Sequence, residues 1–92
     1  MYGVYALGSE KDGKLYIGYS NDIKSRVAAH NAGKVPATRE RLPFVLLYCE
    51  LLASRNDAIH RESYLKSGWG RKYLDRTIPD TLLKFRSKIR RV

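Results

Sequence analysis

The sequence has a single cysteine, Cys49, among its 92 residues, which excludes an internal disulfide. It has no hydrophobic stretch close to the roughly 20 residues of a membrane-spanning helix, so we expect no membrane span. Met1 leads directly into the first predicted strand, which leaves no room for a secretory signal peptide. These absences predict a cytoplasmic protein. Because Cys49 lies in the apolar run 44–49, we expect a buried structural thiol rather than a nucleophile.

Acidic residues are also scarce: there are 9 Asp and Glu against 18 Lys and Arg, a formal net charge of +9. On so small a chain this excess indicates a polyanionic partner, with nucleic acid first and an anionic membrane surface second. A membrane-surface protein would concentrate its charge on one amphipathic helix with a wide apolar face. Here the positive charge is spread over most of the chain, which favours nucleic acid, so we expect DNA and no membrane as the partner.

Motifs for several other chemistries are missing. No Cys/His cluster has zinc spacing, no glycines form a Walker or dinucleotide pattern, and there is no Gly-x-Ser-x-Gly elbow. There are no repeats, linkers or low-complexity segments. The length suffices for one small domain, residues 1–92, and not for two.

Strand and helix patterns alternate along the chain. A β-hairpin is expected from residues 2–8 and 14–19, because the polar loop between them ends in Asp12-Gly13. A third strand, 44–52, is apolar enough to be central in the sheet. Capping residues and apolar spacing predict four helices, at 22–31, 54–66, 71–76 and from Pro79 onward. This order predicts a small α/β sandwich, and the pairing of the third strand stays open.

Each strand of the hairpin carries a tyrosine and a glycine, in Gly3-Val4-Tyr5 and Tyr16-Ile17-Gly18. If the loop holds an even number of residues, Tyr5 and Tyr16 point to the same side of the sheet. Gly3 and Gly18 then share that side and leave a hollow that a ligand backbone could approach. The alternative is that tyrosine is simply a favourable strand residue.

Two predicted helices carry polar side chains near their buried faces. Arg26 and His30 lie one turn apart, and they suit phosphate binding and proton transfer respectively. Glu62 lies within an apolar stripe that ends at Trp69, which we expect to anchor the core. An inward carboxylate is costly unless it is paired. Lys66 is the structural partner, and a divalent cation or an active-site arginine is the functional alternative.

In this order and spacing, these elements resemble the GIY-YIG nuclease superfamily, and in layout its small stand-alone, excinuclease-like members. The resemblance covers nearly the whole chain, although no asparagine follows Glu62, where some members have one. It implies a three-stranded antiparallel sheet and hydrolysis of a DNA phosphodiester bond in repair or recombination, with Mg²⁺ or Mn²⁺ as cofactor. The alternative is a weak or inactive DNA-binding module within a larger repair complex.

The resemblance also implies a role for each motif residue. Tyr5 would activate the attacking water and Tyr16 would position the phosphate or the water. Arg26 would stabilise the phosphate, His30 would assist, and Glu62 would bind the metal. Gly3 and Gly18 would be the structural glycines of the motif. Basic residues add a set of candidate DNA contacts: Lys34, Arg39, Arg41, Lys66, Arg71, Lys72, Lys84, Lys88 and Arg91.

Overall fold

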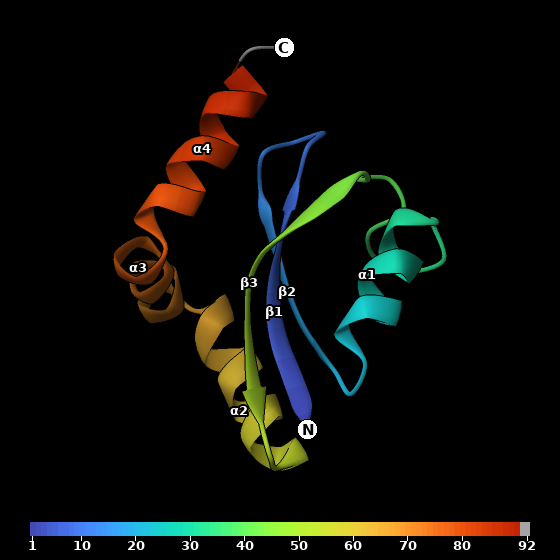
Figure 1. Cartoon of the computed structure of the whole chain (residues 1–92), viewed down its shortest axis with the longest axis vertical. Coiled ribbons are helices and arrows are strands. Elements are labelled where there is room, and N and C mark those ends of the chain that lie inside the picture. The colour runs from blue at the N-terminus through green and yellow to red at the C-terminus, as the bar shows by residue number, and fades with distance from the viewer. Residues whose placement is uncertain (91–92) are drawn as a thin grey trace.

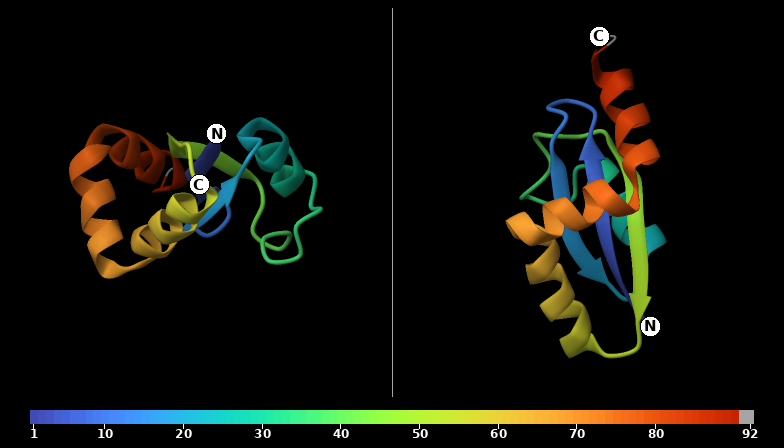
Figure 2. Two further views of the ribbon diagram at one scale, coloured as in Figure 1. Left: turned by 90° about the horizontal axis from the view of Figure 1, so that it is seen from below. Right: turned by 90° about the vertical axis from the view of Figure 1, so that its left-hand side faces the viewer.

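The computed structural model describes residues 1–90 as a three-stranded sheet with helices on both faces (Figure 1). Helix α1 (Ile23–Asn31) covers one face of the sheet. On the other side lie α2 (Arg55–Lys66), α3 (Gly68–Thr77) and α4 (Pro79–Arg90), as Figure 2 shows. The predicted α/β sandwich with an antiparallel sheet is confirmed.

The three strands are β1 (Tyr2–Ser9), β2 (Leu15–Ser20) and β3 (Phe44–Leu52), in the spatial order β2-β1-β3. The prediction that residues 44–52 form the central strand was therefore wrong. The central strand is β1, which is buried from Gly3 to Ser9 and contains small residues that let side chains approach from both faces. On the edge strand β3, Cys49 is exposed, so the expected buried thiol was also wrong.

The helix boundaries follow local capping signals. Asp22 caps α1 by accepting a hydrogen bond from the Ser25 amide at 3.1 Å, and Ser54 caps α2, both as predicted. Helix α3 begins at Gly68, three residues before the predicted start, because Ser67 ends α2 and also accepts from the Gly70 amide at 3.3 Å.

The early start of α3 also decides the position of Trp69. In the first turn of α3 the indole points outward and is 70% exposed, so the expectation of a core anchor was wrong. The ammonium of Lys72 lies 5.3 Å from the ring centroid. Trp69 therefore contributes to the surface of the molecule, where it packs against a cation.

The sheet separates two apolar clusters. Val4, Ala6 and Ile17 pack with Ala58 and Leu65 on the α2 side, whereas Tyr5, Leu7 and Phe44 pack on the α1 side. Because successive side chains of a strand point to opposite faces, β1 supplies both clusters. None of the helices in residues 1–90 combines the length and the apolar character needed to cross a membrane.

Candidate active site

The two tyrosines lie on the face of the sheet that α1 covers. Tyr5 pairs with Gly18 across the hairpin, and Leu7 pairs with Tyr16, so the two phenols are diagonal neighbours on one face. This confirms the prediction that Tyr5 and Tyr16 point to the same side of the sheet. Both rings contact the imidazole of His30, with ring centroids 5.9 Å apart for Tyr5 and 5.1 Å for Tyr16.

The glycines on this face do not leave an open hollow, and that expectation was wrong. A Cβ atom at Gly18 would collide with the phenol of Tyr5, and one at Gly3 would collide with the side chain of Ile23 on α1. The space is thus occupied by the protein itself. Gly18 allows the Tyr5 ring to lie across β2, and Gly3 allows α1 to approach the sheet.

His30 is completely buried, and both of its ring nitrogens are hydrogen-bonded. Nε2 lies 3.0 Å from the hydroxyl oxygen of Tyr5, and Nδ1 lies 2.7 Å from Oγ1 of Thr38. Thr38 is equally buried, in the irregular segment between α1 and β3. Sequence reasoning missed Thr38, because no periodic pattern in that basic segment marks a residue that points inward.

Arg26 lies one turn before His30 on α1 and is exposed. Burial raises the pKa of the Tyr5 phenol, and Arg26 partly offsets this because its guanidinium lies near the phenol oxygen. Burial also lowers the pKa of His30, and the positive charge of Arg26 adds to that effect. At neutral pH the Tyr5–His30 pair is therefore an uncharged phenol bonded to an uncharged imidazole.

Glu62 comes from α2, on the other face of the sheet, yet its charge helps to raise the pKa of Tyr5. Its side chain is 20% exposed, and its ion pair with Lys66 is long, at 3.7 Å. Within residues 1–90, no group of three or more His, Cys, Asp or Glu side chains gathers as a metal site. One accessible carboxylate nevertheless fits Mg²⁺, which commonly keeps several waters and takes one or two protein carboxylates.

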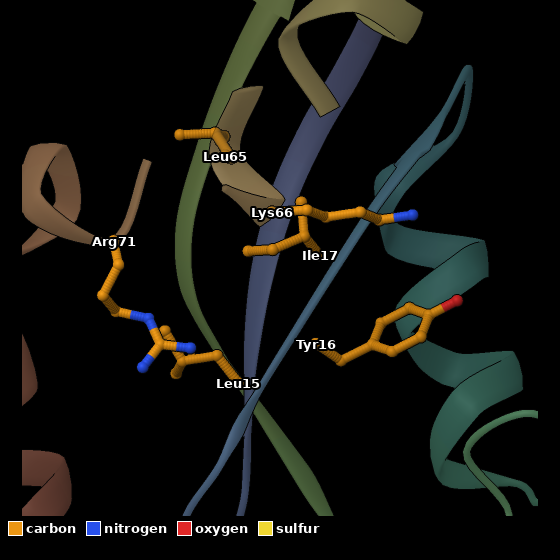
Figure 3. A pocket seen from close by; sticks show the side chains of 6 residues that line it. All are labelled: Leu15, Tyr16, Ile17, Leu65, Lys66 and Arg71. Atoms are coloured by element: carbon orange, nitrogen blue, oxygen red, sulfur yellow. The ribbon is translucent and has the colours of Figure 1, made fainter. Parts of the chain in front are cut away.

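A cavity of about 240 Å³ opens beside Tyr16, between β2 and the α2–α3 junction, and Figure 3 shows the side chains that line it. Lys66 and the phenol of Tyr16 point the same way in this view, toward α1. A second cavity, of about 420 Å³, shares Leu15 and Arg71 with the first. The two cavities together are called the basic groove, and its cations are Lys14, Arg41, Lys66, Arg71 and Arg86.

The structure gathers only some of the predicted DNA contacts in this groove: Arg41, Lys66 and Arg71. Sequence reasoning missed Lys14 as a candidate contact, because its position depends on how the hairpin faces α4. The other candidates lie elsewhere. Lys84 and Lys88 line a different cavity on α4, Lys72 packs on Trp69, Lys34 and Arg39 are exposed in the segment after α1, and Arg91 lies outside the described residues.

Comparison with known proteins identifies the family of the chain. Residues 1–73 match the GIY-YIG catalytic domain, so the chain belongs to the GIY-YIG family. Within that family its relatives are UPF0213 proteins. The chain is 43% identical over 58 residues to the UPF0213 protein of Staphylococcus haemolyticus (strain JCSC1435), a match that covers 62% of this chain and 71% of the relative.

Two further relatives have the same family name. The UPF0213 protein of Streptococcus pneumoniae serotype 4 (strain ATCC BAA-334 / TIGR4) is 46% identical over 57 residues, and the match spans 61% of this chain but only 58% of that protein. The solution NMR structure of UPF0213 protein BH0048 from Bacillus halodurans is 35% identical, with a TM-score of 0.49. That match covers 80% of this chain and 82% of the other.

Proposed function

We propose that this protein is a DNA endonuclease that hydrolyses a phosphodiester bond with Mg²⁺ or Mn²⁺, in the cytoplasm, during DNA repair or recombination. One observation supports the proposal most strongly: Tyr5 and His30 form a buried hydrogen bond, 3.0 Å long, beside Arg26. The charge of Glu62 also affects the pKa of Tyr5. Hydrolysis of a phosphodiester needs a proton acceptor for water and a positive charge for the phosphate, and this group of residues supplies both.

The residues divide the reaction between them. Tyr5 is the group that takes a proton from the attacking water, and His30, uncharged at neutral pH, accepts the proton that the phenol gives up. Arg26 lies one turn before His30 on α1 and is exposed. Its planar guanidinium suits two phosphate oxygens. Tyr16, half-buried beside His30, orients the phosphate or the water.

Glu62 would hold the metal ion, since its carboxylate is accessible and only loosely paired with Lys66. A bound divalent cation supplies charge neutralisation at the phosphate and the leaving oxygen. Glu62 lies on α2, on the opposite face of the sheet, and Arg26 lies on α1. In this proposal the two helices would contribute opposite charges around one phosphate.

A second candidate function is a DNA-binding module with little or no turnover, which acts within a larger repair complex. Two observations favour it. The Tyr5 side chain is only 1% exposed, so water reaches its hydroxyl with difficulty. The basic groove extends away from Tyr16, and its cations would attract phosphates whether or not a bond is cut.

A cleavage assay on flaps, forks, nicked duplex and single strands, with and without Mg²⁺, separates the two functions. Glu62→Gln should abolish Mg²⁺-dependent cleavage and leave DNA affinity nearly unchanged, because it removes the metal ligand and keeps the basic surface. Glu40→Gln makes the same change of charge at an exposed position and should cut like the native protein. Native rates in Glu62→Gln would rule out the metal-ligand role, and absence of cleavage by native protein would favour the binding module.

A further inference from the structure

Thr38 occupies an unusual position for a residue of an irregular loop. It is fully buried, and its Oγ1 lies between two partners, Nδ1 of His30 at 2.7 Å and the carbonyl oxygen of Val35 at 3.4 Å. The motif resemblance gives Thr38 no role. Its hydroxyl nevertheless contacts the one histidine that touches both tyrosines.

The contact with Val35 favours one placement of the hydrogens. The carbonyl of Val35 can only accept, so the Thr38 hydroxyl donates to it. The lone pairs of Oγ1 then remain free to accept from Nδ1–H of His30. A neutral imidazole with a hydrogen on Nδ1 has a lone pair on Nε2, which accepts from the hydroxyl of Tyr5. The three hydrogen bonds thus run in one direction: Tyr5 donates to His30, His30 donates to Thr38, and Thr38 donates to Val35.

We infer that Thr38 is a positioning residue, which holds His30 in the tautomer that accepts the Tyr5 proton. This inference rests on the proposed function of the same site. When Tyr5 takes a proton from water, the O–H bond of water breaks and a new O–H bond forms on Tyr5. The original phenol proton passes to Nε2 of His30. The imidazolium that results keeps its Nδ1–H bond to Thr38, so the proton balance is complete.

The Thr38 side chain is not needed to form the turn that carries it. Backbone hydrogen bonds hold this turn: the Thr38 amide donates to the Val35 carbonyl at 3.0 Å, and the Arg41 amide donates to the Thr38 carbonyl at 2.9 Å. Replacing the hydroxyl by a methyl group of similar size leaves both bonds in place. Thr38→Val therefore tests the hydroxyl rather than the fold.

The first measurement is the tautomer itself, from ¹⁵N NMR of the histidine ring in the metal-free native protein. We expect a protonated Nδ1 and an unprotonated Nε2 at His30. Thr38→Val should produce a mixture of tautomers, because either form still makes one hydrogen bond with Tyr5. Thr38→Ser keeps the hydroxyl and should restore the native pattern. A native protein with the hydrogen on Nε2 would overturn the inference, whatever the protein cuts.

The second measurement is DNA cleavage at saturating substrate. Thr38→Val should lower kcat by about 10- to 100-fold, the loss seen when metal-binding histidines lose a comparable outer hydrogen bond, with little change in KM. Thr38→Ser should recover most of the loss. An unchanged kcat in Thr38→Val would contradict the positioning role. If native protein has the expected tautomer but cuts no DNA, the proposed nuclease function fails while the hydrogen-bond assignment stands.

Discussion

A histidine without exposed surface must satisfy both ring nitrogens inside the protein, and His30 does so with Tyr5 and Thr38. Its other neighbours are aromatic, Tyr16 and Phe44, and Arg26 supplies the charge that affects its pKa. Burial and Arg26 both lower the pKa of His30, and no acidic side chain is among the causes of the shift. The folded protein is therefore more stable with a neutral imidazole at His30 than with a charged one.

This burial predicts that the folded state becomes less stable in acid. The pKa of His30 is lower in the folded protein than its ordinary value of about 6.5, so the unfolded chain binds more protons as the pH falls. The free energy of unfolding should have its full His30 contribution above about pH 6.5 and lose it as the pH falls toward the lower folded pKa. Urea denaturation at several pH values between 5 and 7.5 measures this change.

The variant His30→Gln is expected to be less stable at every pH, because it disturbs a buried hydrogen-bonded site, but to lose this part of the pH dependence. The exposed His60 provides the matched control, and His60→Gln should keep the native slope of stability against pH. If His30→Gln and native protein lost stability equally as the pH fell, another group would be responsible for the acid sensitivity.

At the scale of elements, the junction of α2 and α3 positions the basic groove, since Lys66 ends one helix and Arg71 lies in the first turns of the next. The turn is tight because Gly70 packs against the backbone of Tyr64 and Leu65. A Cβ at Gly70 would collide with these backbone atoms, which cannot move as a flexible side chain can. The close approach of the helices therefore depends on this glycine.

Gly70→Ala should reduce the free energy of unfolding by about 1–3 kcal/mol, the usual cost of overpacking. Gly68 is the matched control, because it is two residues away in the same helix and a Cβ there would meet nothing within 4 Å. Gly68→Ala should be neutral or slightly stabilising, since alanine favours helix more than glycine does. Equal denaturation midpoints for the two variants would show that the junction tolerates the added atom.

At the scale of the whole molecule, the formal net charge is +9, but some of the cations are paired with acidic side chains. Lys84 pairs with Asp80 at 3.1 Å, and Lys88 pairs with Glu10 at 2.6 Å. Lys14 and Arg71, in contrast, line the groove that leads away from Tyr16. A phosphate bound in the groove would therefore meet Lys14 and Arg71 close to Tyr16.

We expect duplex DNA binding to weaken steeply with salt, with a log–log slope of about −0.9 for each phosphate neutralised. Replacing Lys14 and Arg71 together by glutamine should reduce the magnitude of that slope by about 2, one for each lost contact. Replacing Lys84 and Lys88 together removes the same charge but should reduce it less. Affinity that does not change with salt, or a larger effect of the α4 pair, would contradict this distribution.

Much of the fold could be predicted from the sequence because its signals are local. Asp22 and Ser54 cap their helices through amides three residues away, and the shared face of Tyr5 and Tyr16 follows from the two-residue period of a strand. The basic excess follows from composition alone. The central position assigned to residues 44–52 failed because an apolar edge strand and a central strand look alike to a local pattern.

The sequence by itself determined the elements, the faces of the hairpin and the candidate residues Tyr5, Arg26 and Glu62. Only the tertiary structure decided what these residues meet. The space beside Gly18 is filled by Tyr5, and the second hydrogen-bond partner of His30 is Thr38, which comes from an irregular loop. The physical reason is that such contacts join segments whose separation no helical or strand period encodes, so they exist only once the chain has packed.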